Sequence, residues 1–152
     1  MKHVLLALVL VLGTMSCSKK DVVDPITADS NTGSYKLDGR FINCTAKATK
    51  YNPSGGTVEY LTIVLTTMPQ PATGAESLSI SYSIPRGQPA SAYTGNDVIL
   101  FRNQMQPAVL SQMKGPISTN NAGGVSGTFT TSITQSQTAL TITEGVFKDV
   151  RP

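Results

Sequence analysis

An alternation of apolar and polar residues runs through most of the chain, from about residue 35 to residue 150. It is most regular over residues 78–84, where serines separate Leu78, Ile80, Tyr82 and Ile84. A period of two places every second side chain on the same face of an extended strand. The pattern therefore predicts β-strands with one buried face.

Turn-forming residues divide this region into short segments. Asp38-Gly39 predicts a two-residue hairpin, since both residues tolerate positive φ. Residues 52–56, 68–74 and 120–124 are rich in Gly, Pro and Asn and predict further turns. Residues 107–114 have a helix-favouring composition, with Pro107 and Gly115 at the two ends, but we interpret them as a strand. Glu144-Gly145 breaks the phase of the last strand, over residues 138–150, and predicts a bulge there.

Eight to nine strands at regular intervals, with no long crossover between them, are typical of an antiparallel β-sandwich or a small partly open barrel. Residues 35–152 are long enough for one such domain. The predicted core combines the in-phase apolar residues with Cys44 and Tyr82. Its main members are Leu61, Ile63, Leu65, Leu78, Ile80, Ile84, Phe129, Leu140, Ile142 and Phe147.

The N-terminus has the layout of an export signal. A short positive region precedes nine consecutive apolar residues, Val4 to Leu12, and small or polar residues follow up to Cys17. Nine residues are too few to span a bilayer, which needs ~20. Residues 1–16 are therefore predicted to be a signal peptide; an uncleaved anchor or a buried helix is the alternative.

The residues around Cys17 resemble the lipobox of bacterial lipoproteins, with Ser16 as the small residue before the cysteine. The resemblance implies that Cys17 receives diacylglycerol on sulfur and a further acyl chain, such as palmitate, on its amine. The run Cys17-Ser18-Lys19-Lys20-Asp21 looks like the start of Bacteroidetes lipoproteins. It implies a lipid anchor in the bacterial outer membrane, on the periplasmic or the cell-surface face. Residues 17–34 then form the lipidated N-terminus and a flexible tether with a reach of ~20 Å.

The last third of the chain carries a second resemblance. Residues 123–129 (GGVSGTF) and 141–150 (TITEGVFKDV) look like the closing strands of small Bacteroidetes surface lipoproteins of unknown function. That group has an all-β body, which agrees with the strand pattern. The resemblance supplies no catalytic residues.

Composition and charge exclude several functions. The 12 basic and 9 acidic residues are scattered, so no patch suits a nucleic acid. The single histidine, His3, lies in the predicted leader, which leaves no Ser-His-Asp triad and no common transition-metal ligand in the mature chain. We expect neither a metal nor a cofactor. Cys44 is expected to pack in the core once Cys17 is acylated; a free Cys17 could instead pair with it.

The remaining chemistry-bearing residues have structural interpretations. The six acids of the body are spread over six segments. Asp38 is interpreted as a turn residue, Glu76 and Asp97 as residues at strand starts, and Glu59 and Asp149 as solvent-facing residues. Glu144 is the only acid beside a predicted bulge. Aromatic platforms for a glycan are limited to four tyrosines after residue 50. Of these, Tyr60 and Tyr93 are the candidates for exposure.

The sequence therefore predicts a non-enzymatic binding or structural module of the cell envelope, anchored to lipid through Cys17, with a protein or glycan as its unidentified partner. Exposed loops on a rigid sheet would be sufficient for such a role. The alternative is a small barrel that carries an apolar ligand or acts as a carboxylate-dependent hydrolase. That alternative needs an interior cavity or two acids facing one cleft.

Overall fold

The computed structural model describes residues 30–67, 76–103, 107–110, 113–135 and 138–152. These residues form nine strands and one short 3-10 helix, so the all-β expectation is confirmed. The bounds are β1 Thr32–Leu37, β2 Arg40–Tyr51, β3 Val58–Thr67, β4 Glu76–Pro85, η1 Ala90–Ala92, β5 Thr94–Arg102, β6 Ala108–Leu110, β7 Ile117–Thr119, β8 Val125–Gln135 and β9 Thr138–Val150.

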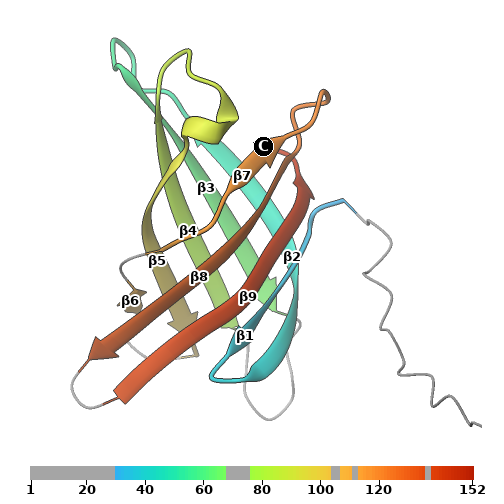
Figure 1. Cartoon of the computed structure of the whole chain (residues 1–152), viewed down its shortest axis with the longest axis vertical. Helices are drawn as coiled ribbons and strands as arrows, with labels where there is room; N and C mark the ends of the chain where they lie inside the picture. Colours follow the sequence, from blue (N-terminus) through green and yellow to red (C-terminus); the bar gives the residue numbers. More distant parts are fainter. Residues whose placement is uncertain (1–29, 68–75, 104–106, 111–112, 136–137) are drawn as a thin grey trace, which may run out of the picture.

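All nine strands belong to one antiparallel sheet, in the order β6-β5-β4-β3-β2-β1-β9-β8-β7. Neighbours in the sheet are neighbours in the chain, except that β1 also pairs with β9. The sheet curls into a half-barrel whose edges are β6 and β7 (Figure 1). Of the two architectures that the sequence left open, the structure is therefore the partly open barrel.

The predicted turns explain the up-and-down course of the chain. Asp38 and Gly39 join β1 to β2 with φ angles of 50° and 83°, the double positive φ of a two-residue hairpin. Residues 52–57 join β2 to β3, and residues 120–124 join β7 to β8. The predicted loop over residues 68–74 lies outside the described residues.

The half-barrel has two distinct ends (Figure 1). At the terminal end lie the turns at 52–57, 86–93 and 120–124 together with both ends of the domain. There the Asn31 N–H donates to the Asp149 carbonyl at 3.3 Å, and the Arg151 N–H donates to Asn31 Oδ1 at 3.0 Å. At the hairpin end lie the 38–39 turn and the starts of β2, β4 and β9. The chain therefore enters and leaves the domain side by side.

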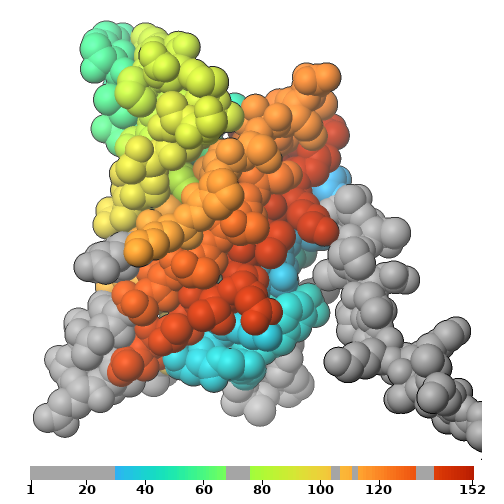
Figure 2. All heavy atoms as spheres, in the orientation of Figure 1, coloured from blue at the N-terminus to red at the C-terminus, as the bar shows by residue number. Residues whose placement is uncertain are grey.

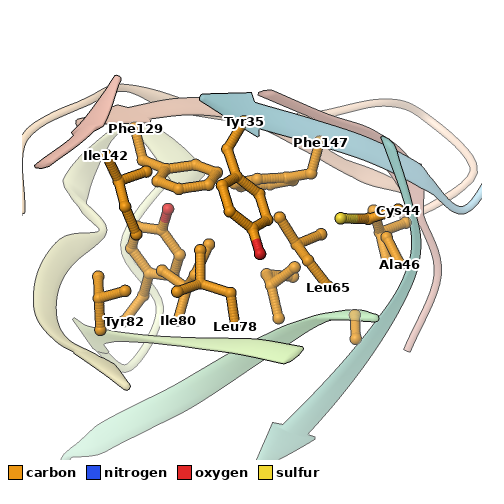
Figure 3. Close-up of a cluster of buried hydrophobic side chains, with 14 of the residues drawn as sticks. Tyr35, Cys44, Ala46, Leu65, Leu78, Ile80, Tyr82, Phe129, Ile142 and Phe147 are labelled. Atoms are coloured by element: carbon orange, nitrogen blue, oxygen red, sulfur yellow. The ribbon is translucent and has the colours of Figure 1, made fainter. Parts of the chain in front are cut away.

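The interior is filled by large apolar side chains from all parts of the sheet (Figure 3). Of the ten main core residues predicted from the alternation, nine are buried, and Leu140 is partly buried and packs against the others. Tyr82 packs edge-on against Phe147, with ring centroids 6.2 Å apart. The alternation therefore identified the interior correctly, because one face of a half-barrel is buried along every strand.

The two C-terminal segments singled out in the sequence, residues 123–129 and 141–150, pack against each other across β8 and β9. Gly127 lies opposite Phe147, and Phe129 lies opposite Gly145. A Cβ on either glycine would come within 2.6 Å of the facing ring, so each phenylalanine occupies the space of a missing side chain. The two rings stack with centroids 6.4 Å apart. The predicted bulge is present beside them, at Glu144, whose φ is 50°.

Candidate functional site

Three charged side chains point into the half-barrel at the hairpin end. Arg40 is in phase with inward Ile42 on β2, Glu76 with inward Leu78 on β4, and Arg102 follows inward Leu100 by two residues on β5. We call Arg40, Glu76 and Arg102 the charged cluster. It lies at one end of a mainly apolar interior.

The geometry of the charged cluster is that of a partly buried ion pair with a second cation nearby. Arg40 Nη2 donates to both carboxylate oxygens of Glu76, at 3.0 and 2.9 Å. Arg102 Nε lies 3.7 Å from Glu76 Oε1. The Glu76 side chain is only 8% exposed, and the Thr67 hydroxyl bonds both the backbone N–H and the carbonyl of Glu76 at 2.9 Å. Because Arg40 and Arg102 both approach this carboxylate, Glu76 is the residue that joins the two arginines.

Tyr35 and Cys44 lie on the inner side of this cluster, and burial is the main cause of the shift in the pKa of each. Burial, together with the nearby Glu76 carboxylate, raises the pKa of the Cys44 thiol to about 12. Burial likewise raises the pKa of the Tyr35 hydroxyl, with Cys44 and Glu76 adding to the effect. Cys44 is free and buried, as expected for a core residue, and it stays a protonated thiol at neutral pH.

Three buried polar atoms of the described side chains have no hydrogen-bond partner: Tyr35 Oη, Tyr82 Oη and Arg102 Nε. The first two belong to residues that are almost completely buried, and Figure 3 shows both hydroxyls inside the cluster of apolar side chains. A buried polar group without a partner costs about 1–3 kcal/mol. At these atoms, hydrogen-bonding groups are buried without a partner in the described structure.

The acids of the body are engaged separately. Glu144 pairs with Lys36 at 2.7 Å, and Glu59 lies 4.0 Å from Arg86. Asp38 accepts a bond from the Thr141 N–H, which fixes the start of β9 against the hairpin. In addition, the described part of the chain gathers no group of three His, Cys, Asp or Glu side chains that could hold a metal ion.

Two adjoining hollows lie beside β7, β8 and β9, on the surface that Figure 2 shows as an orange and red band. Their volumes are about 340 and 300 Å³, and both are bordered by Thr128 and Val146. They open to solvent and are mainly apolar. The one acid in their walls, Glu144, is the partner of Lys36. The hollows therefore offer no carboxylate that is free of an ion pair.

The predicted lipid-attachment residue, Cys17, lies outside the described residues, so its acylation stays a prediction. Among the residues that the structure describes, no helix has the length and apolar character needed to cross a membrane. Comparison with protein-family models, curated proteins and solved structures gives no match to this chain.

Sequence reasoning missed the charged cluster, although the signal was present. Glu76 was interpreted as a polar residue at the start of a strand. It lies two positions before Leu78, so the same alternation that places Leu78 inside also places Glu76 inside. The alternation extends equally to Arg40 and Arg102. The overlooked signal was a charged residue in phase with the inward-facing apolar residues at the end of each of these strands.

Proposed function

We propose that this protein is a lipid-anchored lipoprotein of the bacterial outer membrane that acts as a non-enzymatic binding or structural module. The proposal rests on the export signal, on the lipobox-like residues around Cys17 and on the resemblance of the closing strands to small envelope lipoproteins. Its membrane partner is the lipid leaflet, engaged through the acyl chains on Cys17. Two or three acyl chains on one residue are sufficient for stable anchoring.

The observation that carries the proposal is the order of apolar run, small residue, cysteine and charged residues at the N-terminus. The position of the domain's first residues agrees with it. Asn31 is bonded to Asp149 and Arg151 at the terminal end, immediately before β1. A tether attached there can lead to a membrane without disturbing any strand. The hairpin end, with the charged cluster, then lies on the side of the domain away from the tether.

The non-enzymatic part of the proposal is supported by how the reactive groups are used. The Cys44 thiol is protonated and buried, and the Glu76 carboxylate is held by arginines. A buried, protonated thiol is inert as a nucleophile, and a carboxylate paired with arginines is already occupied by them.

Anchoring is tested with the two cysteines as a matched pair. Cells expressing the wild type, Cys17→Ser or Cys44→Ser are labelled with a palmitate analogue and fractionated. The wild type and Cys44→Ser are expected in the outer membrane with label, and Cys17→Ser without label and released from it. Equal labelling and membrane retention of Cys17→Ser would refute the anchor.

A carrier of a small apolar ligand is the second candidate, and one observation favours it. The hydroxyls of Tyr35 and Tyr82 are inside the half-barrel without partners. A bound molecule with a polar group would satisfy them. Native mass spectrometry of the protein purified from cells tests this candidate, since a carrier retains a ligand mass that denaturation removes.

A further inference from the structure

Two exposed tyrosines form a fixed platform on the outer wall of the half-barrel. Tyr51, the last residue of β2, is paired directly with Tyr60 of β3. Their rings stack with centroids 6.4 Å apart and an angle of 30° between their planes. The exposed fractions are 64% for Tyr51 and 42% for Tyr60. Both rings are thus presented to solvent. The two strands that carry them, β2 and β3, are joined by the hairpin that projects at the terminal end (Figure 1).

The wall that continues from this platform carries hydroxyl groups and almost no charge. We call it the hydroxyl face, and it consists of twelve outward residues of β2, β3 and β4, within residues 45–51, 60–66 and 77–83. Its rows, in register across the three strands, are Tyr51/Tyr60/Ser83, Thr49/Thr62/Ser81, Lys47/Val64/Ser79 and Thr45/Thr66/Ser77. Lys47 is the one charged residue among these twelve positions.

Polar groups also border the tyrosine platform. Ser83, paired with Tyr60, donates a hydrogen bond to Asn96 Oδ1 at 3.1 Å. A hydroxyl and an amide therefore lie next to an aromatic surface. Each hydroxyl can both donate and accept a hydrogen bond, and an amide offers both functions as well.

The chemistry of this face decides between classes of partner. A nucleic acid needs clustered Lys and Arg, which the hydroxyl face does not provide. Protein interfaces have apolar cores and are depleted in serine, whereas serines fill every outward position of β4 from 77 to 83. A sugar ring presents polarised C–H groups that suit the negative face of an aromatic ring, and hydroxyls that exchange bonds with hydroxyls.

We propose that the hydroxyl face binds a neutral polysaccharide, with Tyr51 and Tyr60 as its stacking platform. This inference rests on the proposed binding role and names the chemical class of its ligand. It does not depend on the lipid anchor. Because the rings hold each other in place, little conformational freedom is lost when a sugar stacks on them.

The test is native affinity electrophoresis of the full protein, purified from whole-cell lysates in a non-ionic detergent. The gels contain a neutral polysaccharide (galactomannan, xyloglucan or mixed-linkage β-glucan), an anionic one (alginate) or none. Retardation is expected in at least one neutral gel. It should weaken about tenfold or more in apparent affinity, a loss of about 1.4 kcal/mol or more, in the Tyr51→Ala/Tyr60→Ala variant.

Phe41→Ala is the matched control. Phe41 is an exposed aromatic residue on β2 as well, but it lies at the hairpin end, so its loss should leave retardation unchanged. Circular dichroism confirms that each variant is folded. Absence of retardation in all neutral gels, retardation by alginate alone, or equal retardation of the tyrosine variant would overturn the inference. None of these results affects the anchoring test, which measures label and membrane retention.

Discussion

Replacing Tyr82 by Phe removes one oxygen atom from the buried interior of the half-barrel. Tyr82 is 1% exposed, and its ring contacts those of Tyr93 and Phe147, at centroid distances of 6.4 and 6.2 Å. These ring contacts do not need the hydroxyl. The hydroxyl itself has no hydrogen-bond partner in the structure.

The expected change in stability follows from two opposing contributions. An unpaired buried hydroxyl costs about 1–3 kcal/mol relative to its hydrated state in the unfolded chain. The void left by the oxygen is smaller than a methyl group and costs less than about 1 kcal/mol. Tyr82→Phe should therefore raise the free energy of unfolding by about 1 kcal/mol, or the Tm by about 4 °C for a domain of this size.

Urea and thermal unfolding, followed by circular dichroism, measure this change. Tyr51→Phe is the control, because it removes an exposed hydroxyl and should change stability by less than about 0.5 kcal/mol. A loss of more than about 1 kcal/mol in Tyr82→Phe would refute the reasoning. It would mean that the hydroxyl is bonded to a buried water or ligand, and the carrier function would then gain support.

Three further predictions concern the charged cluster, the glycine–phenylalanine pair and alkaline pH. Glu76→Gln should lower the free energy of unfolding by about 2 kcal/mol, because it leaves two arginines without their carboxylate. Glu144→Gln, in an exposed ion pair, is the control and should lower it by less than about 0.5 kcal/mol. Urea unfolding measures both changes. Gly145→Ala places a Cβ 2.6 Å from three atoms of the Phe129 ring and should lower the free energy of unfolding by about 2–3 kcal/mol. In a double-mutant cycle, adding Phe129→Leu should restore part of this loss. Burial raises the pKa of Cys44 from 9.0 to about 12, so the unfolded chain releases the thiol proton at a lower pH than the folded chain does. The free energy of unfolding should therefore fall above pH 9, by up to about 1.4 kcal/mol per pH unit. Denaturation of Cys44→Ala between pH 9 and pH 10 should lack that part of the slope; an unchanged slope would show that Cys44 does not contribute.

Much of the fold could be predicted from the sequence because each strand buries one face. The period of two separates inward from outward positions on every strand, and Gly, Asn and Pro mark the turns between them. The pattern could not distinguish a sandwich from a half-barrel, since both bury alternate residues of antiparallel strands. That choice depends on the pairing of β1 with β9, which is a contact between distant parts of the chain.

The candidate sites were harder to predict, for two different reasons. Glu76 was overlooked because a charge at the start of a strand is usually solvated, whereas here it is paired with Arg40, 36 residues away in the chain, and lies near Arg102. The tyrosine platform depends on register. Tyr60 was expected at the surface, but its stacking on Tyr51 follows from the β2–β3 pairing, which composition does not specify.

The central claim is that the protein is anchored by lipid on Cys17, and the intact mass of the protein extracted from outer membranes tests it most directly. The account predicts a chain that begins at Cys17 and carries the added mass of a diacylglyceryl group, with or without a third acyl chain. A mass that includes residues 1–16, or that of a chain with an unmodified Cys17, would contradict it.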